Sequence, residues 1–393
     1  MNYDLPESKV IFGGWYQRTT LHLSEIYEFF ANANSRLDLD KTKLKNLHSV
    51  LNITHVTREI GYLEYLLAKT SDGIEIRYYE DGLYTLALYG HNLIDSRGIL
   101  ETYFSDKLNP AIGYIFSLGA PTPKILANIK TKHPTAISIV SLDPANYQID
   151  ENSFGKVYSK VASENLAVLK TNDYIIIAYK QGQQELADRI IDMQIFFREF
   201  KDHLEKYLNI HRKIWEEISN IKEQKYIVGK DVSKVRQRLD AYQKTVNLIT
   251  NRINQMSAYA STRQSISKAL GIEERLRQLF QYKFETLIDT LNYIKELWKM
   301  TTDYLNSAIQ VLTEIRAQTA NRTIQSLTLI TSIGVISGLI INLSKDAFPT
   351  VKPVGLVYLI GLFVLGCLLN LAVLKIYQHK KYKLNISDRD KEI

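Results

Sequence analysis

The chain has 393 residues, of which 45% are hydrophobic, and a formal net charge of +7. This length accommodates one ordinary α/β domain and a helical part, while no basic cluster on that domain indicates nucleic-acid binding. The single cysteine, Cys367, excludes an intramolecular disulfide and a cysteine-based zinc site. No signal peptide is expected, because the first ten residues carry Asp4 and Glu7 without an apolar core.

Residues 1–180 are expected to form an α/β domain in which helices flank a mixed sheet. A strand is predicted at Val10–Trp15, followed by a helix at Glu25–Asn34 with Ser24 as its N-cap. Three strand-like runs then follow, at Tyr62–Lys69, Ile74–Tyr79 and Leu83–Tyr89. Asp-Gly pairs separate these runs, at Asp72-Gly73 and Asp81-Gly82, and such pairs predict a β-meander.

The rest of this domain is predicted to contain one short helix and four further strands. The helix covers Ser96–Lys107 and is expected to end at Asn109-Pro110. The strands are expected at Ala111–Ser117, Thr135–Val140, Leu166–Lys170 and Tyr174–Tyr179. The pattern does not determine the order of the strands in the sheet.

Helical periodicity dominates the following residues. Residues 181–270 are expected to form an antiparallel hairpin of the helices Gln183–Glu223 and Asp231–Leu270, with a break at Tyr226–Lys230. A single long helix is then predicted over Gly271–Leu343, and residues 271–322 form its stalk. Its packed seam alternates spacings of four and three: Leu287, Leu291, Ile294, Trp298, Thr301, Leu305, Ala308, Leu312 and Ile315.

Two uncharged segments, residues 323–344 and 354–374, predict transmembrane helices, because about 20 predominantly apolar residues cross a bilayer. Residues 345–353 would form the outer loop and residues 375–393 a basic tail. The basic flanks place both termini in the cytoplasm of a multi-pass protein of the inner or plasma membrane. The alternative, a buried helical hairpin, needs a larger surrounding protein than this chain supplies.

One face of the first span is polar and is expected to line a pore. Its residues are Asn321, Gln325, Thr328, Ser332, Val335, Leu339 and Asn342. Polar groups in hydrocarbon are costly unless they meet protein or water. Ordinary helix–helix packing is the alternative, and it would leave a membrane tether that does not conduct. A pore requires an oligomer, because two spans cannot enclose one.

Sequence motifs for catalysis are lacking, so the chain is not expected to be an enzyme. It contains no phosphate-binding glycine loop, no HExxH and no GxSxG. His91, His133 and His203 are isolated and are interpreted as structural or surface residues. The acidic residues of the meander either bind a divalent cation between subunits or serve turn formation, which is the simpler interpretation: Asp72, Glu75, Glu80 and Asp81.

The order of these parts resembles the CorA family of divalent-cation channels. Two segments carry the resemblance at the level of motifs, the membrane entry at Asn321–Thr328 and the basic run at Lys375–Leu384. The family's Gly-Met-Asn selectivity motif is replaced by Lys345-Asp346-Ala347, followed by Phe348, at the outer mouth. The resemblance implies a homopentameric pore in a lipid bilayer that a cytoplasmic ligand gates, with magnesium selectivity weakened or lost.

A branch of this family that lacks the selectivity motif accompanies type III CRISPR systems. Resemblance to that branch implies an alternative function, an antiviral membrane effector that responds to a nucleotide second messenger of the adenylated S-adenosylmethionine type. No cofactor is assigned from the residues, and Mg²⁺, another divalent cation and a nucleotide ligand all stay open. The ligand-binding and metal-binding residues are not identified by the sequence, and no nucleic-acid partner is expected.

Overall fold

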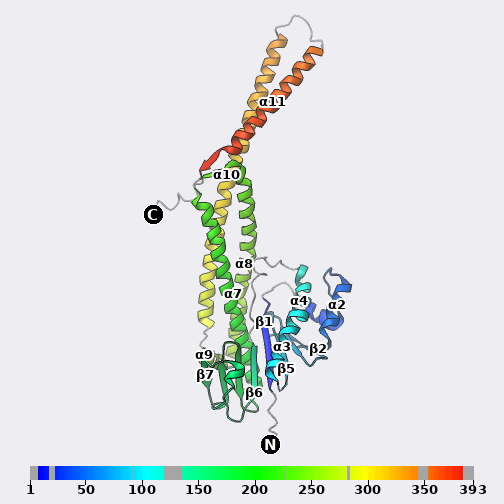
Figure 1. Cartoon of the computed structure of the whole chain (residues 1–393), viewed down its shortest axis with the longest axis vertical. Coiled ribbons are helices and arrows are strands. Elements are labelled where there is room, and N and C mark those ends of the chain that lie inside the picture. Colours follow the sequence, from blue (N-terminus) through cyan, green and yellow to red (C-terminus); the bar gives the residue numbers. More distant parts are fainter. Residues whose placement is uncertain are drawn as a thin grey trace. The chain divides into compact units, whose positions relative to one another are not determined.

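The computed structural model describes residues 8–16, 23–90, 92–118, 135–224, 226–280, 284–343 and 353–383 (Figure 1). Its contacts divide the chain into two compact units, which are described separately. The first unit comprises Met1–Ile210 and Leu248–Leu297, and the second comprises His211–Asn247 and Trp298–Ile393. Each unit therefore combines segments that are far apart in the sequence.

A nine-stranded sheet forms the centre of the first unit, in the order β2-β3-β4-β5-β1-β6-β9-β8-β7. Only the pair β6 and β9 is parallel among these described strands, and all other neighbours are antiparallel. The expected mixed sheet is therefore confirmed. Its strands are β1 (Lys9–Trp15), β2 (Ile53–Glu59), β3 (Tyr65–Thr70), β4 (Glu75–Tyr79), β5 (Leu83–Tyr89), β6 (Thr135–Val140), β7 (Ser159–Ala162), β8 (Leu166–Lys170) and β9 (Tyr174–Tyr179).

The predicted meander is confirmed as β3, β4 and β5, and the Asp-Gly turns explain its register. Gly73 and Gly82 adopt φ values of 79° and 85°, which favour glycine. A Cβ atom on Gly82 would lie 2.1 Å from the carbonyl oxygen of Tyr16, so no other residue fits this turn. The turn after β4 is thereby fixed against the end of β1.

Helices cover both faces of the sheet in this unit (Figure 1). One face packs on a large apolar core with α1 (Leu23–Asn32), α2 (Lys41–Leu51), α3 (Leu93–Tyr103) and α4 (Asn109–Ile115). The opposite face packs on α7 (Gln184–Glu223), where the Trp15 ring stacks on Phe200 with centroids 5.8 Å apart. Alternation of side chains along β1 sends Phe12 to the first core and Trp15 to the second.

Two local predictions in this unit are wrong. Ala111–Ser117 is not a strand, because Asn109-Pro110 opens α4 with its proline in the first helical turn, where the missing N–H costs nothing. The helix before it, α3, continues as a π-helical turn at Phe104–Leu108 (η1) that leads into α4, so it does not end at Asn109-Pro110 as predicted. The remaining short elements are a 3₁₀ turn at Phe116–Leu118 (η2) and α6 (Glu151–Phe154).

The long helices follow the predicted periodicity. After α7 come β10 (Tyr226–Val228), α8 (Gly229–Ala269), α9 (Glu273–Phe280), α10 (Phe284–Leu343), α11 (Pro353–His379) and β11 (Lys381–Lys383). Every residue of the predicted seam on α10 is buried, from Leu287 to Ile315. The single helix expected from Gly271 is described as α9 and α10, and residues 281–283 between them lie outside the described residues.

The prediction of two membrane-spanning helices is wrong. Crossing a membrane takes about 20 predominantly apolar residues in succession. No helix in the described residues combines that length with that apolar character. The fold is therefore corrected to an α+β architecture with long helices, without the predicted spans at residues 323–344 and 354–374. The predicted multi-pass membrane location and the membrane-channel description are corrected with it.

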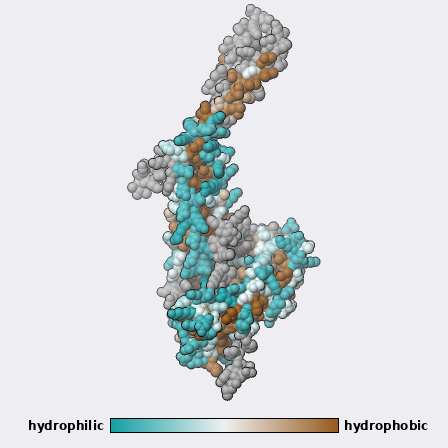
Figure 2. Space-filling model, in the orientation of Figure 1, coloured by the Kyte–Doolittle hydropathy of each residue, from teal (hydrophilic) through white to brown (hydrophobic). Residues whose placement is uncertain are grey.

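The second unit contains the C-terminal end of α7, the N-terminal half of α8, most of α10, and α11. Trp298 is its largest fully buried side chain and lies 5.8 Å from the ring of His211. The strands β10 and β11 pair antiparallel, and the Gly229 amide donates to the Lys380 carbonyl. Apolar side chains are exposed along α11 and the end of α10, including Val335, Ile336, Leu368 and Leu371, and Figure 2 shows this apolar colour on these helices.

Candidate ligand-binding site

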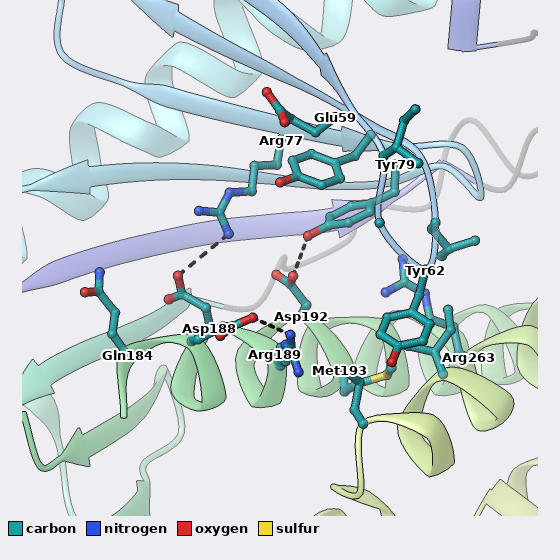
Figure 3. A pocket seen from close by; sticks show the side chains of 17 residues that line it. Glu59, Tyr62, Arg77, Tyr79, Gln184, Asp188, Arg189, Asp192, Met193 and Arg263 are labelled. Atoms are coloured by element: carbon teal, nitrogen blue, oxygen red, sulfur yellow. Dashed lines mark hydrogen bonds and ion pairs between the residues drawn. The ribbon is translucent and has the colours of Figure 1, made fainter. Parts of the chain in front are cut away.

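A cavity of about 580 Å³ lies inside the first unit, between the meander and the helices α7 and α8 (Figure 3). The end of β2 at Glu59 and the following loop residues 60–63 form one wall, and β4 contributes Arg77 and Tyr79. The other walls come from α7 and from the end of α8. We call this cavity the tyrosine pocket, because Tyr62, Tyr65 and Tyr79 line it together with Glu59, Arg77, Glu185, Asp188, Arg189, Asp192, Met193, Arg263 and Ile266.

Strand alternation places Arg77 and Tyr79 on the same face of β4, toward α7 (Figure 3). The Tyr79 hydroxyl donates a hydrogen bond of 2.6 Å to Oδ2 of Asp192. Asp192 is accessible through the pocket but is otherwise enclosed by protein atoms, and this burial raises the pKa of its carboxyl above the usual range. Burial likewise raises the pKa of Tyr79, so its hydroxyl stays a donor at neutral pH.

A second set of charges lies beside this pair. The Arg77 guanidinium contacts Glu75 at 3.0 Å and Asp188 at 3.7 Å, and the Lys9 ammonium lies 3.2 Å from Asp188. Burial alone would lower the pKa of Arg77, but the carboxylates of Asp192, Glu75 and Asp188 raise it. Arg77 therefore stays charged and holds β4 to the first turns of α7.

Among the described residues, the most enclosed ion pair joins Arg263 of α8 to Asp81 in the turn after β4. Nε of Arg263 lies 2.6 Å from Oδ2 of Asp81, and Nη2 lies 2.9 Å from Oδ1. Only 4% and 3% of the two side chains are exposed. Two parallel N–H···O bonds to a carboxylate fix both position and orientation of a guanidinium. Arg263 also lies over the Tyr79 ring, 5.0 Å from its centroid.

The mouth of the pocket is more open to solvent. Tyr62 is 61% exposed and Ile60 is 85% exposed, which is unusual for large apolar or aromatic side chains. Figure 3 shows the Tyr62 ring at the front of the pocket, beside Met193. Arg189 forms an ion pair with Glu185 one helical turn away, and both side chains are partly exposed. Arg189 is therefore the most accessible cation of the pocket wall.

This arrangement suits the binding of a small molecule. Tyrosine rings and Met193 provide apolar and aromatic surface, while paired carboxylates and guanidinium groups provide oriented donors and acceptors. Ser, Cys and His are absent from the described lining, so it holds no Ser–His or Cys–His pair. No group of three or more His, Cys, Asp or Glu side chains that could hold a metal ion occurs in the described residues.

The structure places the predicted pore residues on α10 without bringing them to this pocket. Asn321, Gln325, Thr328, Ser332 and Val335 are exposed. The side chains of Leu339 and Asn342 lie outside the described residues, as do Lys345, Asp346 and Phe348 of the predicted outer mouth. A pore-lining role presupposes a membrane span, so it stays a prediction that the described residues do not support. The homopentamer likewise stays a prediction.

The acidic turn residues have local partners. Asp81 pairs with Arg263, Glu75 with Arg77, and Asp72 with Lys107 at 3.3 Å. These contacts agree with the simpler interpretation, turn formation and ion pairing. His203 packs on Trp15 with ring centroids 5.3 Å apart, and its Nδ1 lies 2.7 Å from the Glu199 carbonyl, which makes it structural. His91 and His133 lie outside the described residues.

Sequence reasoning did not identify the pocket, although one signal for it exists. The buried stripe of α8 contains Ile249, Ile253, Met256 and Ala260, and the next position at helical spacing is Arg263. An arginine at a core position needs a buried partner, and Asp81 is such a partner. Pairing across 182 residues of sequence could not be deduced from spacing.

No family model matches the chain, and neither a curated protein nor a solved structure matches it. The geometry of the pocket therefore carries the functional argument by itself.

Proposed function

We propose that this protein is a ligand sensor whose α/β unit binds a small nucleotide in the tyrosine pocket. The observation that carries the proposal is the pocket itself, a cavity of about 580 Å³ in which aromatic rings and buried, paired charges converge from β4, α7 and α8. A cavity of this size is typical of small-molecule sites. The nucleotide class is also what the resemblance to the CRISPR-associated branch implies.

The aromatic part of the pocket suits a planar base. Tyr65 and Tyr79 lie with ring centroids 5.2 Å apart in the wall, and Tyr62 presents an exposed ring at the mouth. Stacking of a base on an aromatic side chain contributes about 1–3 kcal/mol and tolerates any base. Because the Tyr62 ring is exposed, it is available for this stacking.

The charges suggest how such a ligand is oriented. Four carboxylates and three guanidinium groups line the pocket, and the deep carboxylates of Asp188 and Asp192 disfavour a buried phosphate. They favour donor-rich groups, such as the hydroxyls of a ribose or an exocyclic amine. The phosphate would then lie at the mouth, where Arg189 can exchange its partner Glu185 for it.

Helices α7 and α8 each contribute residues to both units. A ligand that changes either helix at the pocket therefore acts on an element that the second unit also contains. The proposed output is a change in these long helices, and the class of protein is a sensor rather than an enzyme.

Calorimetric titration of the full chain with adenosine monophosphate (AMP) and adenosine tests this proposal. AMP should bind more tightly than adenosine if Arg189 contacts the phosphate. Arg189→Ala should weaken AMP binding roughly tenfold, the effect of losing a charge-assisted hydrogen bond, and leave adenosine binding unchanged. Guanosine, cytidine and uridine monophosphates measure the base preference.

Arg236→Ala is the matched control, because Arg236 forms a partly exposed i,i+4 pair with Asp240 on α8 and does not line the pocket. It should bind AMP as the unaltered chain does. Absence of binding for all four mononucleotides and for adenosine at millimolar concentration would refute the proposed ligand class. Equal losses in Arg189→Ala and Arg236→Ala would refute the assignment of the phosphate to Arg189.

A further inference from the structure

The turn that follows β4 is joined to three separate elements through one residue, Asp81. Its carboxylate accepts the two hydrogen bonds from Arg263 of α8, and Oδ1 also accepts from the Leu83 amide at 3.2 Å. Its backbone carbonyl accepts from Nε1 of Trp15, on β1, at 2.7 Å. Gly82 fixes the same turn through its positive φ and its close approach to Tyr16. These contacts therefore hold Asp81 in a fixed position.

Arg263 has donors beyond those that Asp81 uses. Its Nε and Nη2 atoms bind Asp81, whereas Nη1 makes no hydrogen bond within the described part of the chain. The side chain is buried, yet it lines the pocket (Figure 3). A guanidinium group carries five N–H donors in a rigid plane. Asp81 therefore fixes one edge of the guanidinium group and leaves the Nη1 donors unused by the described residues.

The same guanidinium is packed between aromatic rings from two further elements. Its carbon lies 5.0 Å from the Tyr79 ring centroid and 5.5 Å from that of Phe196, on α7. Tyr79 is in turn hydrogen-bonded to Asp192 of α7. A ligand that contacts Tyr79 or Arg263 thus touches a connected set of groups from β4, α7 and α8, all within the first unit.

We propose that Arg263 is the pocket residue that transmits ligand binding to α8, and that Asp81 positions its guanidinium for this contact. The inference rests on the proposed nucleotide-binding function. Arg263 donates from Nη1 to an acceptor atom of the ligand while Asp81 retains the opposite edge. The ligand then bridges the meander and α8, and it reduces local opening of α8 around Arg263. Arg189 at the mouth contributes to affinity but has no such connection to α8.

Hydrogen exchange measured by mass spectrometry, with and without saturating AMP, tests this. In the unaltered chain AMP should slow exchange both in α7 around Asp192 and in α8 around Arg263. The test variant replaces both buried charges, Asp81→Leu with Arg263→Met, since apolar residues in place of a buried ion pair commonly preserve folding. AMP should bind this variant roughly tenfold more weakly, and at saturation it should protect α7 but no longer α8.

The matched control is the double variant Arg97→Met with Glu101→Leu, which removes another ion pair of the first unit, away from the pocket. It should retain both protected regions. Protection of α8 that persists in the Asp81→Leu/Arg263→Met variant at saturating AMP would overturn the proposal. Loss of α7 protection together with α8 protection, at saturation, would also overturn it, because the pair would then support the whole site.

The conservative variant Arg263→Lys tests the proposal even if the double variant does not fold. Lysine keeps the charge beside Asp81 but cannot bridge it bidentately while donating to the ligand. Protection of α8 should fall by at least half at saturating AMP, and undiminished protection would contradict the proposal. If unaltered protein binds no AMP in the titration, the proposed function fails. In that case, hydrogen exchange of ligand-free Arg263→Lys tests the ion pair separately. Exchange around residue 263 should be faster than in the unaltered chain if the pair stabilises α8.

Discussion

Two ion pairs between helical arginines and carboxylates distinguish the two units of this protein. In the first unit, Arg263 and Asp81 are 4% and 3% exposed, and Arg263 lines the tyrosine pocket. In the second unit, Arg238 of α8 and Glu217 of α7 also form an ion pair, but these side chains are 53% and 39% exposed. Water screens the second pair and stabilises its members separately, whereas each member of the first depends on the other.

The comparison shows where this chain places charges that are costly to bury. The long helices of the second unit keep charges on the outside and pack an apolar seam around Trp298 and Leu305. In the first unit, the face of the sheet that packs on α7 instead encloses several charged groups around the tyrosine pocket. Enclosure of polar groups is a cost for folding, so their concentration at one cavity supports a binding role there.

Removal of the buried carboxylate should give the largest effect on stability. Asp81→Ala leaves the Arg263 guanidinium without its partner, and breaking a buried pair from one side costs about 3–5 kcal/mol. Urea unfolding followed by circular dichroism measures this loss. Glu217→Ala, the same truncation at the exposed pair, should cost less than about 1 kcal/mol. Similar losses in the two variants would show that burial does not distinguish the pairs.

Two glycine-to-alanine substitutions, one in the turn that carries Asp81 and one in α3, test the rigidity of that turn. Gly82→Ala places a methyl group against the Tyr16 carbonyl at a positive φ, and such strain costs about 1–3 kcal/mol or more. Gly98→Ala, in α3, meets no atom within 4 Å and should stabilise the chain by about 0.5–1 kcal/mol through helix propensity. Thermal unfolding gives both values. Tolerance of Gly82→Ala would mean that the turn is not fixed.

The exposed ring at the mouth should affect binding rather than folding. Tyr62→Ala should weaken AMP binding by about 1–3 kcal/mol, the contribution of one stacked base, and leave the unfolding midpoint unchanged. Tyr158→Ala is the control, because Tyr158 is 66% exposed and does not line the pocket. Calorimetry measures both affinities. Unaltered affinity in Tyr62→Ala would exclude Tyr62 from the site.

The smallest expected effect concerns pH. Burial raises the folded-state pKa of Asp192, so ionisation opposes folding, and the penalty appears as pH rises above the unfolded value of 3.8. Asp192→Asn cannot ionise, so its stability relative to the unaltered chain should improve between pH 4 and pH 7. Urea midpoints over this range measure the trend.

Asp150 is the control, because its pKa is shifted in the direction opposite to that of Asp192. Its carboxylate accepts from Ser153 and from the Asn152 amide at the start of α6, and these bonds lower its pKa. A lowered pKa stabilises the folded chain above pH 3.8, and that stabilisation is lost as pH falls. Asp150→Asn should therefore become relatively less stable as pH rises from 3 to 7. The same slope in both variants would contradict the assigned directions.

The sequence by itself determined the local elements wherever a pattern depends on neighbours in the chain. The Asp-Gly turns produced the meander, short and largely apolar runs produced β6, β8 and β9 at their predicted residues, and the four-three spacing identified the buried seam of α10. These features arise from backbone preferences and from side-chain periodicity, which act within one segment. The Asn109-Pro110 step shows the limit, because the sequence predicts a helix end there, whereas the helical turn η1 leads directly into α4.

Only the tertiary structure decided the strand order and the site. The parallel pairing of β6 with β9 and the contact of Asp81 with Arg263 join residues far apart in the chain. Local preference carries no information on such contacts, since they depend on which buried groups can satisfy one another. Arg263, at an apolar position of α8, requires a buried carboxylate, and Asp81 in the turn after β4 provides it. That requirement is visible in the sequence, but its partner is fixed only by the fold.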